Sequence, residues 1–328
     1  MATPRIYITR PLPDAAIRLI DGIADYRQWD REDAPVPRET LLREIVDVDG
    51  IICLITEKMD ADAIDRARRC RVISQVAVGY DNIDVAAATR RGILVTNTPG
   101  VLTETTADMA WALLLATARR VVEGDKFTRS GRWKTWELMA FTGQDVYGAT
   151  LGIVGMGRIG VAIARRARGF AMSVLYHNRR RAEALEADIG ARYVELDDLL
   201  HQSDFVVIST ALTPETHHLI GERQLALMKP SAVLVNIARG PIVDQRALYR
   251  ALVDKKIWAA GLDVFEVEPV PIDEPLLKLD NVVMPPHLGS GSINTRIKMA
   301  SMAVENCLAG VTGRMPPNAV NPEALEHR

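Results

Sequence analysis

Short apolar runs rich in β-branched residues alternate along this chain with segments of helical periodicity. In the first third, such runs predict strands at residues 6–9, 50–55, 72–76 and 93–96. A second series predicts strands at 149–154, 174–176, 205–208, 232–235 and 281–284, with another ending near Leu262. Apolar strands that alternate with helices form parallel sheets joined by right-handed crossovers. The pattern therefore predicts an α/β protein.

The character of the chain changes near residue 100 and changes back near residue 288. After the turn at 97–100, one long helix is predicted from Thr103 to about Asp125, with a centre that is apolar on every side. Such a helix is buried or covered by another subunit. We therefore expect a discontinuous domain, residues 1–100 and 289–328, around a continuous one, residues 101–288. Each is expected to be Rossmann-like or flavodoxin-like with a parallel sheet.

The composition narrows the class of protein. The 328 residues carry 40 Lys and Arg against 42 Asp and Glu, so a basic surface for nucleic acid or an anionic membrane is not expected. Three cysteines are too few and too scattered for a disulfide framework or a cysteine-rich metal site. The sequence shows neither a signal-peptide start nor an apolar stretch of about 18 residues. We expect a cytoplasmic protein without a bound metal and without nucleic-acid or membrane partners.

A glycine-rich turn follows the predicted strand at 149–154. The sequence GMGRIG places Gly155, Gly157 and Gly160 in a G-x-G-x-x-G spacing before an Ala/Arg-rich helical segment. In this context the first glycine permits a tight turn, the second lets the backbone approach a pyrophosphate, and the third allows close helix–strand packing. The helix N-terminus adds free N–H groups and partial positive charge. The turn predicts a dinucleotide site, and a glycine turn without a ligand is the alternative.

The end of the next strand bears on which dinucleotide binds. NAD sites usually place an Asp or Glu about 20 residues after the glycines, against the ribose hydroxyls. Here the chain has Asn178, Arg179 and Arg180, and no acid before Glu183. Guanidinium groups bind the 2′-phosphate of NADP, which a carboxylate would repel. We therefore expect NADP(H) to be preferred, with NAD(H) as the other cofactor; a solvated basic turn is the alternative interpretation.

Hydride transfer to a carbonyl also needs a proton donor, and His suits neutral pH. Of six histidines, only His287 follows a buried type of strand, and ligands of open α/β sheets bind at such strand ends. Arg239 follows another strand and can hold a substrate carboxylate bidentately. Glu266 and Glu268 follow a third strand, and a glutamate that bonds the imidazole favours its protonated form. Spacing alone leaves open which glutamate contacts His287.

Several motifs together resemble the D-isomer-specific 2-hydroxyacid dehydrogenases. NIARG, GLDVFEVEP and PPHLGSGS lie downstream of GMGRIG, and VAVGYDNID lies in the first third, so the resemblance covers nearly the whole chain in the family's order. It implies that Arg239 binds the substrate carboxylate and that His287 is the acid–base group. It also implies that Glu268, just before Pro269, is the partner of His287. GSGS replaces the more usual GSAT after His287, a change that affects helix capping there.

The same resemblance implies the other binding residues. The backbone N–H groups of Val78 and Gly79 would bind the substrate carboxylate, and Ile55 and Leu102 would wall the substrate pocket. Asp263 would bind the nicotinamide carboxamide. The remaining cofactor contacts that it implies are Thr106 near the nicotinamide, Arg158, Ile159, Thr216, Ile237, Ala238 and Gly289. Family members are typically homodimers joined through the nucleotide domain, which suits the apolar helix.

Within the family, VLYHNRRR and the ending RMPPNAVNPEAL are typical of the glyoxylate/hydroxypyruvate reductase group, which commonly uses NADPH. The resemblance therefore implies NADPH-dependent reduction of a small 2-keto acid, glyoxylate or hydroxypyruvate, to the D-2-hydroxy acid. A 2-ketogluconate reductase and a non-catalytic, cofactor-sensing corepressor are the alternatives, because one fold serves many functions. The complete Arg–Glu–His set favours catalysis.

Overall fold

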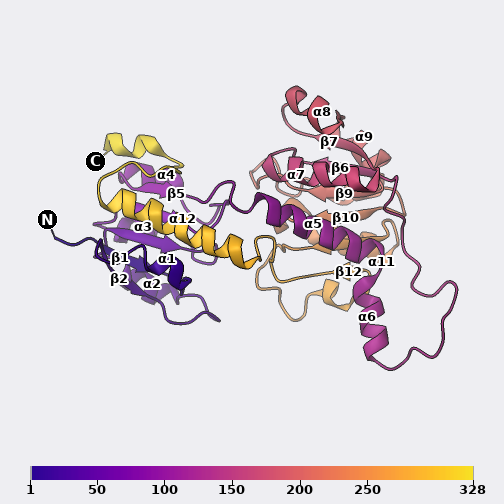
Figure 1. The fold of residues 1–328 in the computed structure, drawn as a ribbon, viewed down its shortest axis with the longest axis horizontal. Coiled ribbons are helices and arrows are strands. Elements are labelled where there is room, and N and C mark those ends of the chain that lie inside the picture. The colour runs from indigo at the N-terminus through magenta and orange to yellow at the C-terminus, as the bar shows by residue number, and fades with distance from the viewer. Residues whose placement is uncertain (1, 328) are drawn as a thin grey trace. The chain divides into compact units, whose positions relative to one another are not determined.

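The computed structural model describes residues 2–327, which form two compact units (Figure 1). The first unit runs to Leu102 and resumes at Ser292, and the second is Thr103–Gly291. The borders expected after residues 100 and 288 thus fall after residues 102 and 291. Each lies where a helix starts, because Thr103 is the first residue of α5 and Ser292 is the N-cap residue of α12.

The first unit is built on a five-stranded parallel sheet in the order β2–β1–β3–β4–β5. Its strands are β1 (Arg5–Ile8), β2 (Asp25–Gln28), β3 (Gly50–Cys53), β4 (Val72–Gln75) and β5 (Leu94–Thr96). Its helices are α1 (Asp14–Ile17), α2 (Arg38–Glu44), α3 (Ala61–Arg66), α4 (Val85–Arg90), α12 (Ile293–Val311) and the 3-10 helix η4 (Pro322–His327). This strand order is flavodoxin-like, and its winding reverses between β1 and β3.

Alternation along the strands explains why both faces of this sheet are covered. Ile6 and Ile8 of β1 belong to a core that includes Ala300 of α12. Tyr7, between them, belongs to the other core, which includes Leu41 of α2. Successive side chains of a strand point to opposite faces, so a buried parallel sheet needs helices on both.

The second unit carries a seven-stranded parallel sheet in the order β12–β11–β10–β9–β6–β7–β8. Its strands are β6 (Thr150–Val154), β7 (Ser173–His177), β8 (Ala191–Tyr193), β9 (Phe205–Ile208), β10 (Val233–Asn236), β11 (Ala259–Leu262) and β12 (Val282–Val283). Its helices are α5 (Thr103–Ala118), α6 (Val121–Arg129), α7 (Arg158–Ala167), α8 (Glu183–Ile189), α9 (Leu196–Gln202), α10 (Glu222–Leu227) and α11 (Gln245–Val253), with 3-10 helices η1 (Arg168–Phe170), η2 (Gly240–Ile242) and η3 (Pro275–Lys278). The winding reverses between β6 and β9, as in Rossmann folds. The expected fold class, α/β with two parallel sheets, is confirmed.

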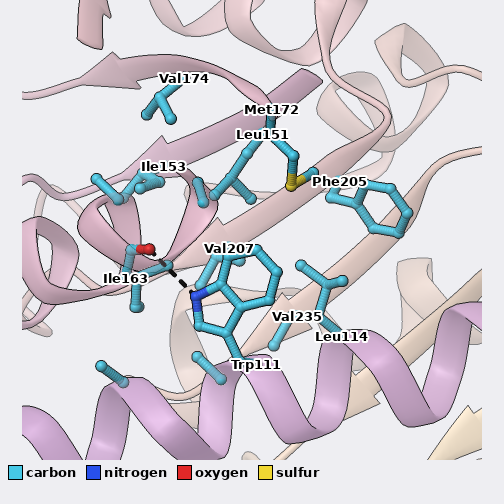
Figure 2. Close-up of a cluster of buried hydrophobic side chains, with 14 of the residues drawn as sticks. Trp111, Leu114, Leu151, Ile153, Ile163, Met172, Val174, Phe205, Val207 and Val235 are labelled. Atoms are coloured by element: carbon cyan, nitrogen blue, oxygen red, sulfur yellow. Dashed lines mark hydrogen bonds between the residues drawn. The ribbon is translucent and has the colours of Figure 1, made fainter. Parts of the chain in front are cut away.

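Figure 2 shows one of the cores of the second unit. Trp111 of α5 lies among side chains of β6, β9 and β10, such as Ile153, Val207 and Val235. Its indole Nε1 donates to the Ile163 carbonyl of α7 at 3.1 Å. A Trp side chain fills a large volume in a core, and when it is buried its indole N–H needs an acceptor. The Ile163 carbonyl is that acceptor. The indole therefore joins α5 and α7 to the sheet.

The single long helix expected at 103–125 is wrong, because the structure has two helices there. Arg120 lies between α5 and α6 and adopts the left-handed conformation, with φ 53°. The Ala118 carbonyl at the end of α5 accepts the Gln144 N–H of the returning loop at 2.9 Å. A contact with a distant part of the chain therefore coincides with the helix end.

The hydrophobic pattern also misses two short strands. All four residues of β2 are exposed at the sheet edge, so they carry no apolar signal. The other missed strand, β8, has only three residues. The strand expected at 50–55 ends at Cys53, and residues 54 and 55 turn into a loop. Within residues 2–327, the helices are too short or too polar to cross a membrane.

Candidate active site

The glycine turn joins β6 to α7 at the point where the second sheet reverses its winding. Gly155 has φ 103°, and a Cβ on it would lie 2.6 Å from the Thr210 backbone nitrogen. A Cβ on Gly160 would lie 2.3 Å from the Gly155 carbonyl oxygen. Side chains larger than glycine do not fit at either position, so both glycines are explained by packing alone.

Gly157 differs from its neighbours, because a Cβ there would meet nothing within 4 Å. It is the exposed N-cap residue of α7, and in the described chain its helix has no side-chain cap. Uncapped N–H groups and the helix dipole favour an anion at this end. The open approach at Gly157 therefore fits a pyrophosphate, with Arg158 and Ile159 in the first turn of the helix.

Asn178 connects the end of β7 to the glycine turn. Its Oδ1 accepts the Met156 N–H at 2.7 Å, so its amide N–H groups stay available as donors. Arg179 and Arg180 are exposed and make no hydrogen bond or ion pair with any residue from 2 to 327. Arg181 is different, because it pairs with the Glu186 carboxylate.

The Arg181 guanidinium contacts both oxygens of Glu186, at 2.7 and 2.8 Å. This hydrogen bond, and a second from the Tyr176 hydroxyl, lower the pKa of Glu186 to about 2. Of the three arginines in this turn, one is therefore committed within the protein. The guanidinium groups of the other two, Arg179 and Arg180, are exposed.

Arg239 follows β10 in a loop that Asn236 shapes. The buried Asn236 amide donates to the Arg239 carbonyl at 2.9 Å and accepts the Ala238 N–H at 3.1 Å. A Cβ on Gly240 would lie 1.8 Å from the Phe265 carbonyl carbon, so the loops after β10 and β11 are in direct contact. Sequence reasoning missed Asn236, although an Asn at a strand end is a typical turn-shaping residue.

His287 and Glu268 are in contact, with 2.7 Å between imidazole Nδ1 and carboxylate Oε2. The other carboxylate oxygen accepts the Phe265 N–H at 2.9 Å. Burial alone would raise the pKa of Glu268. The hydrogen bond and charge of His287, the Phe265 N–H and the charge of Arg239 lower that pKa by more. The pKa of Glu268 therefore lies below its ordinary value. The structure therefore brings Arg239, Glu268 and His287 together.

Glu266 contacts a different histidine. Its Oε1 lies 2.8 Å from His218 Nε2 and accepts the Gln245 N–H at 3.1 Å. The choice that spacing leaves open is therefore settled geometrically, since Glu268 meets His287 and Glu266 meets His218. The second pair was missed because His218 lies in a polar loop that carries no strand-end signal.

Asp263, at the end of β11, holds the backbone that follows His287. Its Oδ1 accepts the Leu288 N–H at 2.6 Å and its Oδ2 accepts the Gly289 N–H at 2.7 Å. Burial raises the pKa of Asp263, although these two N–H groups and the charge of His287 oppose the rise. His287 itself has φ 51°, a left-handed conformation that is strained for a residue with a side chain.

The other expected cofactor residues also lie in the second unit. A Cβ on Gly289 would lie 3.5 Å from the Thr106 methyl carbon, so Thr106 adjoins the Asp263 carboxylate and the loop that it holds. Thr216 donates its hydroxyl to the Ala211 carbonyl at 2.7 Å and thereby closes its own loop after β9. Two further expected cofactor residues, Ile237 and Ala238, directly follow β10.

The expected substrate residues belong to the first unit. Ile55 follows β3 and is half-buried, and Val78 and Gly79 follow β4 and are half-buried as well. Leu102 is buried at the border of the unit. Because β3 and β4 are adjacent and parallel, Ile55 and the Val78–Gly79 segment follow the same edge of that sheet.

Comparison with known proteins gives consistent matches. Residues 111–289 match the family described as D-isomer specific 2-hydroxyacid dehydrogenase, NAD binding domain. A glyoxylate reductase of Korarchaeum cryptofilum is 52% identical over 326 residues, covering 99% of this chain and 98% of that protein. The structure of an NADPH-dependent glyoxylate/hydroxypyruvate reductase from Sinorhizobium meliloti, in complex with NADP and malonate, is 33% identical with a TM-score of 0.85 and covers 98% of both chains. A glyoxylate reductase from Paecilomyes thermophila is 34% identical with a TM-score of 0.85, covering 98% of this chain and 99% of that one.

Gly157→Ala should separate ligand binding from packing. The added methyl group meets no protein atom, so the free energy of unfolding should change by less than about 1 kcal/mol, while NADPH affinity should fall severalfold because the backbone is shielded from the pyrophosphate. Gly160→Ala is the control, because its methyl group clashes with a carbonyl and should destabilise the fold. Urea unfolding and calorimetric titration with NADPH measure both effects. A stable Gly157→Ala variant with unchanged NADPH affinity would show that the turn does not hold the cofactor.

Proposed function

This chain belongs to the D-isomer specific 2-hydroxyacid dehydrogenase family and is an NAD(P)-dependent dehydrogenase, and we propose that within this family it reduces small 2-keto acids with NADPH. Glyoxylate is the first proposed substrate, since relatives that are 52% and 49% identical to this chain bear the name glyoxylate reductase. Hydroxypyruvate is the second, by analogy with the Sinorhizobium meliloti reductase. The product is the corresponding 2-hydroxy acid, in the D form where it is chiral.

The observation that carries this proposal is the 2.7 Å contact between His287 and Glu268, beside the charge of Arg239. A protein that only senses the cofactor needs no acid–base pair. Here the glutamate engages imidazole Nδ1, which leaves Nε2 as the atom that exchanges a proton with substrate. This arrangement favours an enzyme over a cofactor-sensing corepressor.

When bound, NADPH supplies the hydride that reduces the keto carbon. His287, protonated and supported by the Glu268 carboxylate, donates a proton from Nε2 to the keto oxygen as negative charge develops there. Arg239 binds the substrate carboxylate and polarises the adjacent carbonyl with its guanidinium group. The chain thereby orients the substrate and supplies the proton that the reduction consumes.

We further propose how substrate and cofactor are held. The Val78 and Gly79 N–H groups bind the carboxylate, and Ile55 and Leu102 limit the size of the keto acid. The Asp263 oxygens each keep a second acceptor site, which can take a nicotinamide carboxamide N–H. Contacts with the rest of the cofactor come from the glycine turn and the residues expected with it: Thr106, Thr216, Ile237, Ala238 and Gly289.

We propose that the enzyme forms a homodimer through its second unit. Trp133, Trp136, Leu138 and Met139 follow α6 and are 61–74% exposed. A cluster of large exposed apolar side chains marks an interaction surface, and a second copy of this chain fits the expectation from the family. The mass in solution, measured by light scattering, tests this.

A cytoplasmic location stays our prediction, because three free cysteines suit a reducing compartment.

The double variant Arg179→Ala, Arg180→Ala should bind NADPH much more weakly than the wild type and bind NADH almost unchanged. These exposed guanidinium groups form no hydrogen bond or ion pair within residues 2–327 and suit the 2′-phosphate, which NADH does not have. Arg181→Ala is the matched control, because that arginine is already paired with Glu186. Fluorescence titrations with both cofactors measure the ratio. An equal loss for NADPH and NADH would rule out the assignment of the 2′-phosphate site.

Glu268→Gln should lower the pH above which keto-acid reduction is lost. The pKa of Glu268 lies below its ordinary value, so the carboxylate is charged at neutral pH and stabilises the protonated imidazole. A neutral amide supports the proton donor less well than the carboxylate does, so reduction should be lost at a lower pH. Glu266→Gln is the matched control, since Glu266 contacts His218 instead.

NADPH oxidation with glyoxylate, hydroxypyruvate and 2-ketogluconate, measured across pH, provides this test. We expect the alkaline limb of kcat/KM to move only in the Glu268 variant. The proposal fails if the wild type reduces neither glyoxylate nor hydroxypyruvate, and the role of Glu268 fails if both variants keep the wild-type limb.

A further inference from the structure

Two loops of the first unit carry the proposed substrate contacts, and side-chain amides join them. Residues 54–58, after β3, include Ile55, and residues 76–83, after β4, include Val78 and Gly79. The loops meet again further on, where Met59 and Ile83 form an isolated parallel bridge. Loops without regular structure hold a defined shape only when side chains or bridges fix their backbone groups.

Asn82 makes the direct connection between these loops. Its Nδ2 donates to the Leu54 carbonyl at 3.1 Å and to the Glu57 carbonyl at 2.8 Å. Its Oδ1 accepts a hydrogen bond from Gln75 Nε2 at 2.8 Å. Both donor hydrogens of the amide are therefore committed to the loop that carries Ile55.

The Val78–Gly79 segment is held by two further amides. Gln75, which is fully buried, donates to the Gly79 carbonyl at 3.3 Å, and Asn97 donates to the Val78 carbonyl at 2.8 Å. In a trans peptide the N–H points opposite to the C=O of the same unit. Anchoring the Val78 carbonyl on Asn97 therefore directs the Gly79 N–H away from Asn97.

The start of the Ile55 loop is also held by the buried Glu57 carboxylate. Its Oε2 accepts the Thr9 hydroxyl at 2.6 Å and the Leu54 N–H at 3.0 Å. Thr9 follows β1, so this contact spans the gap between β1 and β3, where the first sheet reverses its winding. Loops at such a point are where open α/β sheets bind ligands.

We propose that Asn82 is a positioning residue for the substrate: its amide sets the spacing between Ile55 and the Val78–Gly79 N–H groups. This inference rests on the proposed function, because it takes these residues as the substrate contacts. Asn82 acts through the two loops, because its side-chain hydrogen bonds in the described chain go to Leu54, Glu57 and Gln75, all of the first unit. Its loss should therefore weaken substrate binding and size discrimination, and leave NADPH affinity unchanged.

The test compares Asn82→Ala and Asn82→Asp with Asn321→Ala. Asn321 is a matched control, because its buried amide also joins segments that are far apart in the sequence but contacts neither substrate loop. It accepts the Val95 N–H and donates to the Ile93 carbonyl and the Thr89 hydroxyl. Asn82→Asp keeps the shape of the side chain and replaces its donors with an acceptor. The readouts are KM and kcat for glyoxylate and hydroxypyruvate, the NADPH Kd, and hydrogen exchange of residues 76–83.

We expect both Asn82 variants to raise the KM for glyoxylate by roughly tenfold, with a smaller change in kcat, because each leaves backbone carbonyls without their donor. The glyoxylate-to-hydroxypyruvate ratio of kcat/KM should change, exchange at 76–83 should increase, and the NADPH Kd should stay within about twofold. Asn321→Ala should show none of these effects, even if it unfolds more easily.

The outcomes separate this inference from the proposed function. A wild type that reduces no keto acid contradicts the proposed function, and exchange at 76–83 then decides whether Asn82 holds the loops. In an active enzyme, a KM within twofold of wild type in the Asn82 variants overturns the inference. An equal rise in KM for Asn321→Ala overturns it too, because the effect would then follow from lost stability alone.

Discussion

The two hydrogen bonds that the Asp263 carboxylate accepts from Leu288 and Gly289, at 2.6 and 2.7 Å, fix the backbone on which the acid–base pair depends. His287 has φ 51°, and such a conformation costs about 1–3 kcal/mol for a residue with a side chain. Hydrogen bonds to a charged group contribute about 1.5–3 kcal/mol each, which is enough to offset that strain. They fix the backbone that follows His287 and so help to keep the imidazole within hydrogen-bond distance of Glu268.

The parallel sheet explains how residues far apart in the sequence reach one place. The glycine turn, Arg239, Asp263 and His287 follow β6, β10, β11 and β12, so all lie beyond the carboxyl ends of strands in one sheet. Each loop is then set by a separate polar anchor, such as Asn178 for the glycine turn. In the first unit polar side chains also fix the loops after the strands, but most of these anchors are the neutral amides of Asn and Gln.

Features that depend on local sequence could be predicted without the structure. The apolar strands, the glycine spacing and the position of His287 after a strand all follow from residue patterns. The family resemblance also pointed to Glu268, but periodicity could not, because the choice between Glu266 and Glu268 depends on the path of the loop after β11. The end of α5 was missed for a similar reason, since the Gln144 N–H that meets its last carbonyl comes from a distant loop.

The polar anchors were the hardest features to predict. Gln75 and Asn236 end strands β4 and β10, and Asn82 lies in the loop after β4. Asn is common in ordinary turns, so the identity of these residues alone does not show what they bind. The edge strand β2 escaped prediction because its exposed side chains show no apolar alternation. In each case the missing information was a tertiary contact.

In the proposed reaction His287 supplies the proton for reduction of a 2-keto acid, and His287→Ala tests this role most directly. Turnover with NADPH and glyoxylate or hydroxypyruvate should fall by about 10²–10⁴-fold, the usual contribution of a general acid, while the Kd for NADPH stays near the wild-type value. Near-normal turnover of the variant with these acids would mean that another group donates the proton, and would contradict the account.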